Sequence, residues 1–295
     1  MKYSGYAGQV LRINLSKNSI KKEPLQDEVI EKYLGGSGFC AYYLTKEIKP
    51  SVKAFDEENK LMFANGPFSA TLWPQSSRYS VAAVSPLTDA WGEAHSGGYW
   101  CAELKMAGYD GIIIEGISKQ PVYIEISDDK VEIKTADHLW GKDVKEATDT
   151  IKQAGDYRVV AIGRSGEKKV RFACIMTDYH RAAARCGLGA VMGSKNLKAI
   201  AVRSTRGVKV SKPEEYMKVM KIIRDKLLSS PYSHQYSAYG TLLLPGMLND
   251  LGRLPTYNGQ ESTFKDCEKV DGKLMKKERI LKSRACGGCM LRCAQ

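Results

Sequence analysis

The chain has 295 residues, of which 43% are hydrophobic and 26% charged, a balance typical of a soluble globular protein with one large or two ordinary domains. No stretch approaches the roughly 18 apolar residues that a membrane helix needs, and the N-terminus lacks the apolar core of a signal peptide, so we expect a cytoplasmic protein without a membrane anchor. The formal net charge of +12 indicates either a solvated basic face or an acidic partner, such as nucleic acid or an acidic electron carrier.

The first two hundred residues read as strands joined by glycine-rich turns. Alternating residues at 10–15 and a return from Ile20 predict a hairpin, and 122–126 with 131–133 predict a second one around Asp128-Asp129. Helical spacing of apolar residues appears at 39–48 and 142–153. Further strands are predicted at 61–64, 79–84, 111–115, 159–162, 170–175 and 199–202.

The character of the sequence changes after Val210. Ser211 with Glu214 three positions later predicts a helix start that Ser211 caps, and helical periodicity continues to Leu228. Little strand pattern returns beyond that point. The sequence therefore predicts an α+β protein with a β-rich domain over 1–208 and the start of a mostly helical domain over 209–295.

Three segments combine small residues with arginine, as expected of loops that hold an anionic polar ligand. Small residues let the backbone approach a ligand closely, and arginine offers forked donors to phosphate oxygens or a planar heterocycle. The alternative is ordinary tight turns with surface arginines. The segments are 73–78, which ends in Arg78, 95–99, which contains His95, Ser96 and Gly97, and 180–190, which contains Arg181, Ala182, Ala184 and Arg185.

Two glycine motifs give little support to nucleotide binding. The spacing of Gly187, Gly189 and Gly193 matches a dinucleotide-binding loop, but arginines and small residues precede it instead of a hydrophobic strand. A phosphate-binding P-loop is absent, since 163–166 lacks a downstream Gly-Lys-Ser/Thr.

The C-terminal cysteine trio is the sharpest chemical signal. Cys286, Cys289 and Cys293 converge on one metal centre if the backbone turns at Gly287-Gly288. This spacing favours an iron–sulfur cluster over structural zinc, because a zinc ribbon requires a second cysteine pair. The fourth ligand is not identified, and Cys267 is a poor candidate for it.

In combination, these motifs resemble the N-terminal portion of the aldehyde:ferredoxin oxidoreductase family, whose members are tungsten-pterin, iron–sulfur enzymes. The resemblance runs in order along essentially the whole chain. It rests on 8–16, 58–61, 66–67, 85–88, 96–99, 103–105, 107–110, 166–167, 180–183 and, most specifically, 189–199.

The resemblance implies a base domain of two β-sheets that holds a tungsten (or molybdenum) bis-pterin cofactor. In this family the arginine at Arg78 lies between the pterin and a 4Fe–4S cluster. The trio Cys286, Cys289 and Cys293 matches three of the four cluster ligands. The residues that match contacts to the pterin, or to the Mg²⁺ bridging its phosphates, are His95, Ser96, Gly97, Arg181, Ala182, Ala184 and Arg185.

Two positions depart from the family pattern. His95 stands where an asparagine is usual, so a contact there is expected from the backbone carbonyl. Ala184 stands where a glycine is often found, which requires a roomier approach to the ligand. Asp178 and His180 precede the third loop and are interpreted as residues that brace it.

The implied reaction is oxidation of an aldehyde to a carboxylic acid, with electrons passing through the pterin and the cluster to ferredoxin. Family members are about twice this length, and the complete enzyme is expected to be a homo-oligomer. The fourth cysteine, the acid/base residues and the substrate channel would come later in the sequence. The open alternatives are an inactive fragment, a split subunit that requires a second polypeptide, a relative acting on hydroxy acids or aromatic thioesters, and a nucleic-acid-binding protein with a zinc knuckle, which we do not expect.

Overall fold

The structure, a computed structural model, describes residues 2–280 and 282–294. It divides into two compact units. Unit 1 comprises the residues up to Thr71 together with Gln75–Ser211, and unit 2 comprises Leu72–Pro74 and the residues from Lys212 onward. Among the described residues, none of the helices combines the length and the apolar composition needed to cross a membrane.

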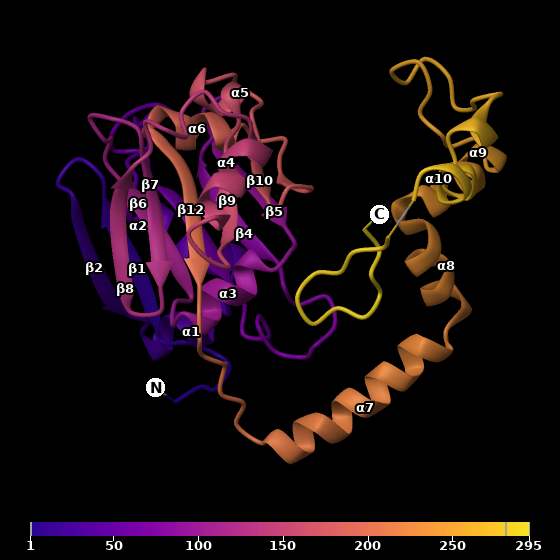
Figure 1. Ribbon diagram of the computed structural model, residues 1–295, viewed down its shortest axis with the longest axis horizontal. Coiled ribbons are helices and arrows are strands. Elements are labelled where there is room, and N and C mark those ends of the chain that lie inside the picture. The colour runs from indigo at the N-terminus through magenta and orange to yellow at the C-terminus, as the bar shows by residue number, and fades with distance from the viewer. Residues whose placement is uncertain (1, 281, 295) are drawn as a thin grey trace. The chain divides into compact units, whose positions relative to one another are not determined.

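Unit 1 is built on two six-stranded sheets within its described residues (Figure 1). The first has the order β2-β1-β6-β3-β4-β5, and the second has the order β11-β10-β9-β12-β7-β8. The first sheet contains β1 (Gln9–Asn14), β2 (Ser19–Pro24), β3 (Leu61–Asn65), β4 (Tyr79–Val84), β5 (Trp91–Ser96) and β6 (Gly111–Glu115). The second contains β7 (Val122–Ser127), β8 (Lys130–Thr135), β9 (Arg158–Ala161), β10 (Ile175–Thr177), β11 (Arg181–Ala183) and β12 (Leu197–Arg203).

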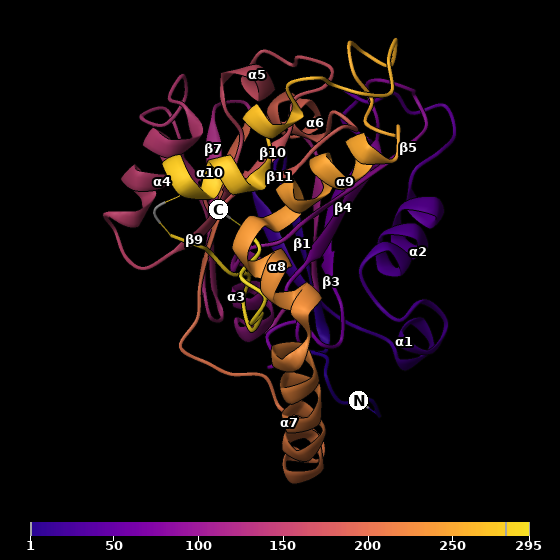
Figure 2. The same ribbon diagram turned by 90° about the vertical axis from the view of Figure 1, so that its right-hand side faces the viewer.

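The main hydrophobic core lies between the sheets. Side chains alternate across a strand, so Ile112 and Ile114 of β6 face this core while Ile113 faces the outer side. That outer side packs against α1 (Asp27–Tyr33) and α2 (Ser37–Glu47). The outer side of the second sheet packs against α4 (Val144–Lys152), and these helices flank the two sheets in Figure 2.

Two short helices, α3 (Trp100–Met106) and α6 (Leu188–Ser194), contribute to the same core. The Trp100 indole N–H donates to the Ile200 carbonyl at 3.0 Å, which fixes α3 on β12. Every residue of α6 is buried. A Cβ added at Gly189 would lie 2.4 Å from the Cys174 carbonyl, and one at Gly193 would lie 2.0 Å from the carbonyl of Gly166 in α5 (Arg164–Glu167). These glycines therefore serve close packing of the backbone.

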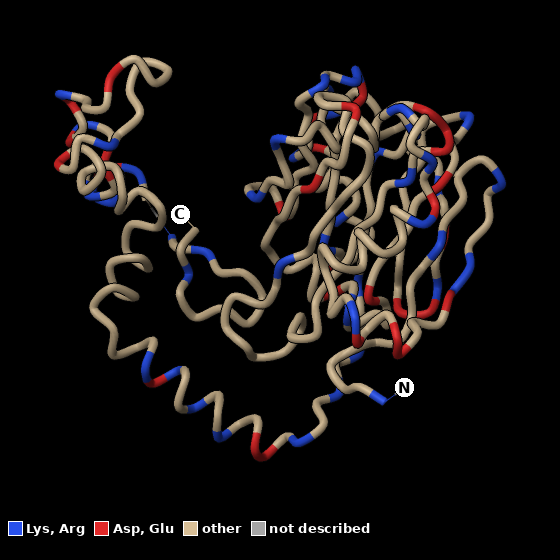
Figure 3. The backbone as a smooth tube through the Cα atoms, turned by 180° about the vertical axis from the view of Figure 1, so that it is seen from behind, with Lys and Arg blue, Asp and Glu red and all other residues tan. Residues whose placement is uncertain are grey.

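Unit 2 is mostly helical, and its helices bury few side chains. Met220 is the buried residue of α7, and α8 and α9 have none among the described residues. Two glutamates stand at the start of α7, and basic residues predominate along the rest of the helix (Figure 3). The elements are α7 (Pro213–Ser229), α8 (Pro231–Tyr239), η1 (Gly240–Leu243), α9 (Leu244–Asp250), η2 (Cys267–Lys269) and α10 (Gly272–Glu278).

The expected α+β class with two sheets is confirmed, but two local predictions are wrong. The strand expected at 170–175 is mostly a turn, closed by the Ala173 N–H donating to the Val170 carbonyl at 2.8 Å, and β10 begins only at Ile175. The N-cap of α7 is Lys212, without a side-chain hydrogen bond, so Ser211 does not cap it. Pro213 fits this start because a proline lacks only an N–H that the first turn leaves unbonded.

Candidate functional site

The edges of the two sheets meet at β5 and β11, which pack against each other in unit 1. The 95–99 loop leaves the end of β5, and the 180–185 segment contains β11. The Thr177 hydroxyl donates to the Ser96 hydroxyl at 3.2 Å, and the Tyr99 N–H donates to Asp178 Oδ2 at 2.8 Å. Two consecutive residues of the second sheet thus bind both ends of the loop that follows the first sheet.

The Arg78 segment joins the same cluster. The Ser77 hydroxyl donates to the Gly98 carbonyl at 2.9 Å, and the Cys101 thiol donates to the Arg78 carbonyl at 3.1 Å. Directly after Arg78, Tyr79 pairs with Ser96 across β4 and β5. The backbone of Arg78 is therefore held beside the 95–99 loop while its side chain is exposed. The fold brings together the three segments that the sequence singled out.

Arg181 carries the clearest unsatisfied hydrogen-bonding capacity of this cluster. Its Nε and Nη2 are buried and have no hydrogen-bond partner within the described part of the chain. A buried donor without a partner costs about 1–3 kcal/mol, so an anionic ligand that reaches these atoms would recover that energy. Ala182, Ala184 and Arg185 of the same segment are exposed.

Left-handed backbone conformations occur in the three segments and directly before the third one. Gln75, Gly98, Asp178, Tyr179 and Arg185 have φ values of 64°, 107°, 47°, 75° and 79°. Such conformations cost energy for residues other than glycine and cluster at ligand sites. Changes of backbone hand can also turn successive N–H groups toward an anion. The backbone geometry is therefore suited to a polyanionic ligand.

The side chain of His95 is engaged by its neighbours. Its Nδ1 lies 3.1 Å from the Ser80 hydroxyl, and its Nε2 lies 3.1 Å from Glu93 Oε1. Glu93 also accepts a hydrogen bond from Ser37 on α2. Both ring nitrogens therefore have partners, so they are not free to contact a ligand.

A chain of buried hydroxyl groups lies beneath the site. The Tyr79 hydroxyl is 2.8 Å from the Thr177 hydroxyl, which in turn donates to Ser96. Burial raises the pKa of Tyr79 well above its usual value, so its phenol stays protonated and donates. Sequence reasoning missed Thr177, and it included Ser77 only as part of the 73–78 segment, because a lone hydroxyl residue carries no motif and only its long-range contacts reveal its role.

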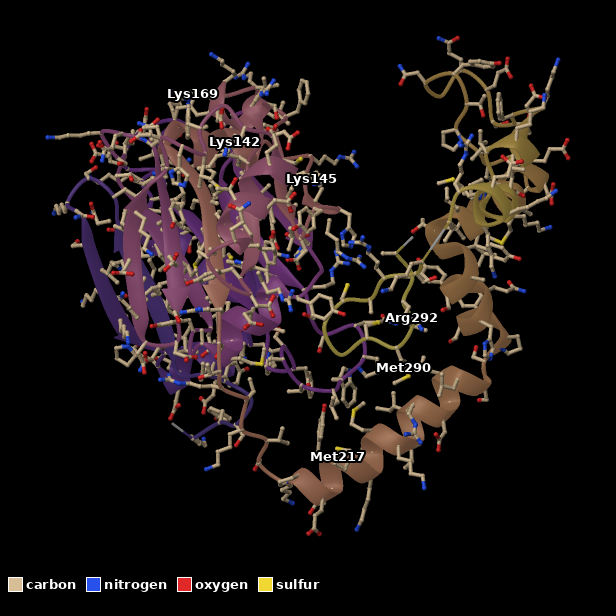
Figure 4. All side chains as sticks on the ribbon, in the orientation of Figure 1. Lys142, Lys145, Lys169, Met217, Met290 and Arg292 are labelled. Carbon is tan, nitrogen blue, oxygen red and sulfur yellow. The ribbon has the colours of Figure 1, made fainter. Side chains whose placement is uncertain are left out.

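The cysteine trio lies in a closed loop of unit 2. Arg284 and Ala294 exchange two backbone hydrogen bonds of 2.7 and 3.2 Å, and this isolated bridge encloses all three cysteines. The Cys289 N–H donates to the Cys286 carbonyl at 3.1 Å, and Gly288 and Arg292 are left-handed, with φ of 68° and 51°. Figure 4 labels Met290 and Arg292 on this loop.

The trio is half-buried and its thiols are not joined in disulfides. Among the described residues, no three histidine, cysteine or acidic side chains gather closely enough to hold a metal ion. The closed loop nevertheless offers three thiols of the donor set of an iron–sulfur site, for which a fourth ligand is needed. Cys267 is buried in η2 and is 6% exposed.

One end of unit 1, which carries α4 and α5, displays lysines. Lys142, Lys145 and Lys169 lie there (Figure 4). Lys145 pairs with Asp149 at 2.6 Å, whereas Lys169 is exposed and has no ion pair within the described residues. A lysine unpaired in the described part of the chain, such as Lys169, is a group of the kind that attracts acidic partners.

Comparison with known proteins gives consistent matches over both units. Residues 10–204 match the aldehyde ferredoxin oxidoreductase N-terminal domain, and residues 218–295 match domains 2 and 3 of aldehyde ferredoxin oxidoreductase. The chain is 43% identical over 295 residues to the tungsten-containing aldehyde ferredoxin oxidoreductase of Pyrococcus horikoshii, covering 99% of this chain and 49% of the relative. The chain therefore spans about half the length of the curated relatives it matches.

Two further proteins show the breadth of the similarity. The WOR-like subunit of the aliphatic sulfonate oxidoreductase of Pyrococcus furiosus is 35% identical over 233 residues, which cover 73% of this chain and 37% of that protein. Among solved structures, the active-site complex BamBC of benzoyl coenzyme A reductase, in complex with 1,5-dienoyl-CoA, matches with a TM-score of 0.85 and 32% identity. That match covers 98% of this chain and 47% of the BamBC chain.

Proposed function

The chain belongs to the aldehyde ferredoxin oxidoreductase family, and on that premise we propose that it is the cofactor-holding part of an enzyme that oxidises aldehydes to carboxylic acids. Residues 1–208 form the bis-pterin-binding domain, and residues 209–295 form the start of the helical domain that carries the iron–sulfur loop. The observation that carries the proposal is the convergence of the Arg78, 95–99 and 180–185 segments at the β5–β11 edge.

The residues present at this edge fit a tungsten-pterin cofactor. The partnerless Nε and Nη2 of Arg181 would bond the pterin phosphates, and Arg185 would add a second guanidinium. The backbone at His95, Ser96 and Gly97 and at Ala182 and Ala184 would contact the pterin or a bridging Mg²⁺, since their side chains are small or already engaged. Molybdenum is the alternative metal.

When bound, the cofactor would supply a centre that accepts two electrons from the substrate, and a 4Fe–4S cluster would supply a one-electron carrier. The protein's own part is to hold the ligand, to exclude water and to provide a path for electron transfer between the pterin and the cluster. Arg78, with its backbone fixed beside the 95–99 loop, would lie between pterin and cluster. Cys286, Cys289 and Cys293 would supply three cluster ligands as thiolates.

We assign the later half of the family's length to a further polypeptide segment or a second polypeptide, which would bring the fourth ligand and the acid/base residues. The large apolar residues that unit 2 leaves exposed support this assignment, because soluble surfaces seldom expose so many. They include Met217, Ile222, Leu228, Tyr232, Met247 and Leu251. Homo-oligomerisation of the complete enzyme belongs to the same proposal.

Ferredoxin is the proposed electron acceptor, with the cytoplasm as the place of action. Ferredoxins are acidic carriers, and the net charge of +12 together with the lysine-bearing end of unit 1 would favour their approach electrostatically. Such steering weakens as salt rises. Neither nucleic acid nor a membrane is assigned as a partner.

The deciding experiment combines composition with turnover. The chain is co-produced with the polypeptide that supplies the later half of the family's length, and the anaerobically purified protein is analysed for tungsten, molybdenum, iron, zinc and pterin. We expect tungsten with pterin, about four iron atoms per chain, and aldehyde-dependent reduction of ferredoxin. Zinc in place of iron, with no pterin, would overturn the proposal and favour a zinc-knuckle protein. Loaded cofactors without any turnover would favour an inactive remnant.

A second candidate substrate class is aromatic thioesters, because the benzoyl coenzyme A reductase complex matches nearly the whole chain at a TM-score of 0.85. Hydroxy acids are a third class among related enzymes. A panel of aldehydes, hydroxy acids and benzoyl-CoA distinguishes these classes with the same purified protein.

A further inference from the structure

We propose that Asp178 is a positioning residue that holds the 95–99 loop of the first sheet against the 180–185 segment of the second. This inference rests on the proposed function only for the identity of the ligand. The contact between the two segments is present in the chain without any ligand. Asp178 does not touch the reacting groups in this assignment. Its role is to fix the distance between the two halves of the cofactor site.

The contact itself is short and buried. Asp178 is 7% exposed, and its Oδ2 accepts the Tyr99 N–H at 2.8 Å. The approach leaves no room for a side chain on the loop, since a Cβ added at Gly98 would lie 2.9 Å from the same Oδ2 and 3.1 Å from a methyl group of Thr177. The loop therefore lies directly on the side chains of Thr177 and Asp178.

Asp178 is itself anchored to the second sheet. Its N–H donates to the Val159 carbonyl of β9 at 3.2 Å, and its carbonyl lies 2.6 Å from Nδ1 of His180. Asp178 and Tyr179 are consecutive left-handed residues that turn the chain into β11 and Arg181. Aspartate tolerates this conformation better than most residues. One residue thus sets both the turn that precedes Arg181 and the position of Tyr99.

The second oxygen of this carboxylate, Oδ1, is buried and has no hydrogen-bond partner in the described part of the chain. The Tyr99 N–H is therefore the hydrogen-bond donor that satisfies the buried Asp178 carboxylate within the described residues, and the loop and the carboxylate depend on each other. The cation–π contact of Arg158 with the Tyr99 ring, at 5.4 Å, restrains the side chain of the same residue.

The test compares Asp178→Ala with Asp178→Asn by hydrogen exchange of the full chain, followed through peptides that cover 95–99 and 180–185. Loss of a hydrogen bond to a charged acceptor predicts exchange at 95–99 that is about ten- to a hundredfold faster in the alanine variant. The asparagine variant keeps an acceptor oxygen and should restore most of the protection. Both segments should respond together, while β12 should not change.

Asp128→Ala is the matched control. Asp128 is also a left-handed aspartate whose carboxylate accepts a backbone N–H, from Thr205 at 3.1 Å, but its contacts lie at the β7–β8 turn. The Asp128→Ala variant should leave hydrogen exchange at 95–99 unchanged. If Asp178→Ala does not fold, Gly98→Ala perturbs the same contact from the loop side and should accelerate exchange at 180–185.

Two further readouts separate this inference from the proposed function. In the assembled protein, Asp178→Ala should lower the pterin content per chain, and Asp178→Asn should largely restore it. Unchanged exchange at 95–99 in Asp178→Ala would overturn the positioning role, even if the parent protein contains pterin. Coupled exchange in a parent that never acquires pterin would support the positioning role and count against the proposed function alone.

Discussion

Nζ of Lys105 lies 2.9 Å from Oδ1 of Asp110, and both side chains are completely buried. Lys105 also donates to the Gly66 carbonyl at 2.9 Å, and the Asp110 carboxylate accepts the Gly8 N–H at 2.7 Å. The pair therefore ties α3 and the chain before β6 to the backbone that leads into β1 and to the turn that follows β3.

Removing one member of this pair should destabilise unit 1 strongly. Lys105→Met leaves the Asp110 charge buried without its partner, which costs about 3–5 kcal/mol. The double variant Lys105→Met/Asp110→Leu should recover much of that loss, because no uncompensated charge remains. Denaturant unfolding of the four proteins in this cycle measures the effect. Equal losses in the single and double variants would contradict it.

Arg181→Met should act in opposite directions on stability and on cofactor retention. Removing two buried donors that have no hydrogen-bond partner should raise the free energy of unfolding of the ligand-free chain by about 1–3 kcal/mol. The pterin content of the assembled protein should fall. Arg171→Met, at an exposed arginine of the neighbouring turn, is the control for both measurements. A loss of stability in ligand-free Arg181→Met would show that its guanidinium is already satisfied.

Lys195 should make the chain more stable as the pH rises above 8. Its Nζ bonds the Gly116 carbonyl at 3.1 Å, and burial lowers its pKa from 10.5 to about 8. Between these two values the unfolded chain binds more protons than the folded chain, so the free energy of unfolding rises with pH. The gain is at most about 3 kcal/mol, and below pH 8 the cost of burying the charge is present in full.

Lys195→Met removes this contribution. Urea unfolding at intervals from pH 7 to 10.5 should give a flatter profile for the variant than for the parent, while Lys209→Met, in the segment before α7, should leave the parent profile unchanged. Parallel profiles for parent and Lys195→Met would show that burial does not lower the pKa of Lys195 in the folded state.

Serine at Cys286, Cys289 or Cys293 should remove iron from the assembled protein, because a hydroxyl does not replace a cluster thiolate. Cys40→Ala is the control. Cys40 is fully buried, and burial raises the pKa of its thiol well above the usual value, so it does not supply a thiolate. Iron per chain and the visible absorption of the cluster are the measurements. Full iron content in all three serine variants would assign the cluster to other residues.

Sequence patterns predicted correctly those strands and turns that depend on residues close together in the chain. The alternation in β1 and β2, the Asp128-Asp129 turn and the isoleucines of β6 each specify a strand or turn within a few residues. The prediction of a strand at 170–175 failed because the Ala173 N–H closes a tight turn that apolar composition does not reveal. Short elements such as β11 and the fully buried α6 were missed because only their tertiary contacts make them regular.

By itself the sequence determined the α+β class, most strands, the cysteine loop and the family, because each depends on residue types at fixed spacing. Only the tertiary structure decided that Ser77 binds Gly98, that Thr177 binds Ser96 and that Asp178 holds Tyr99. The physical reason is that these contacts join residues 21, 81 and 79 positions apart, at an edge where two separate sheets meet. No local propensity encodes such a meeting, and it forms only when both sheets bury a common core.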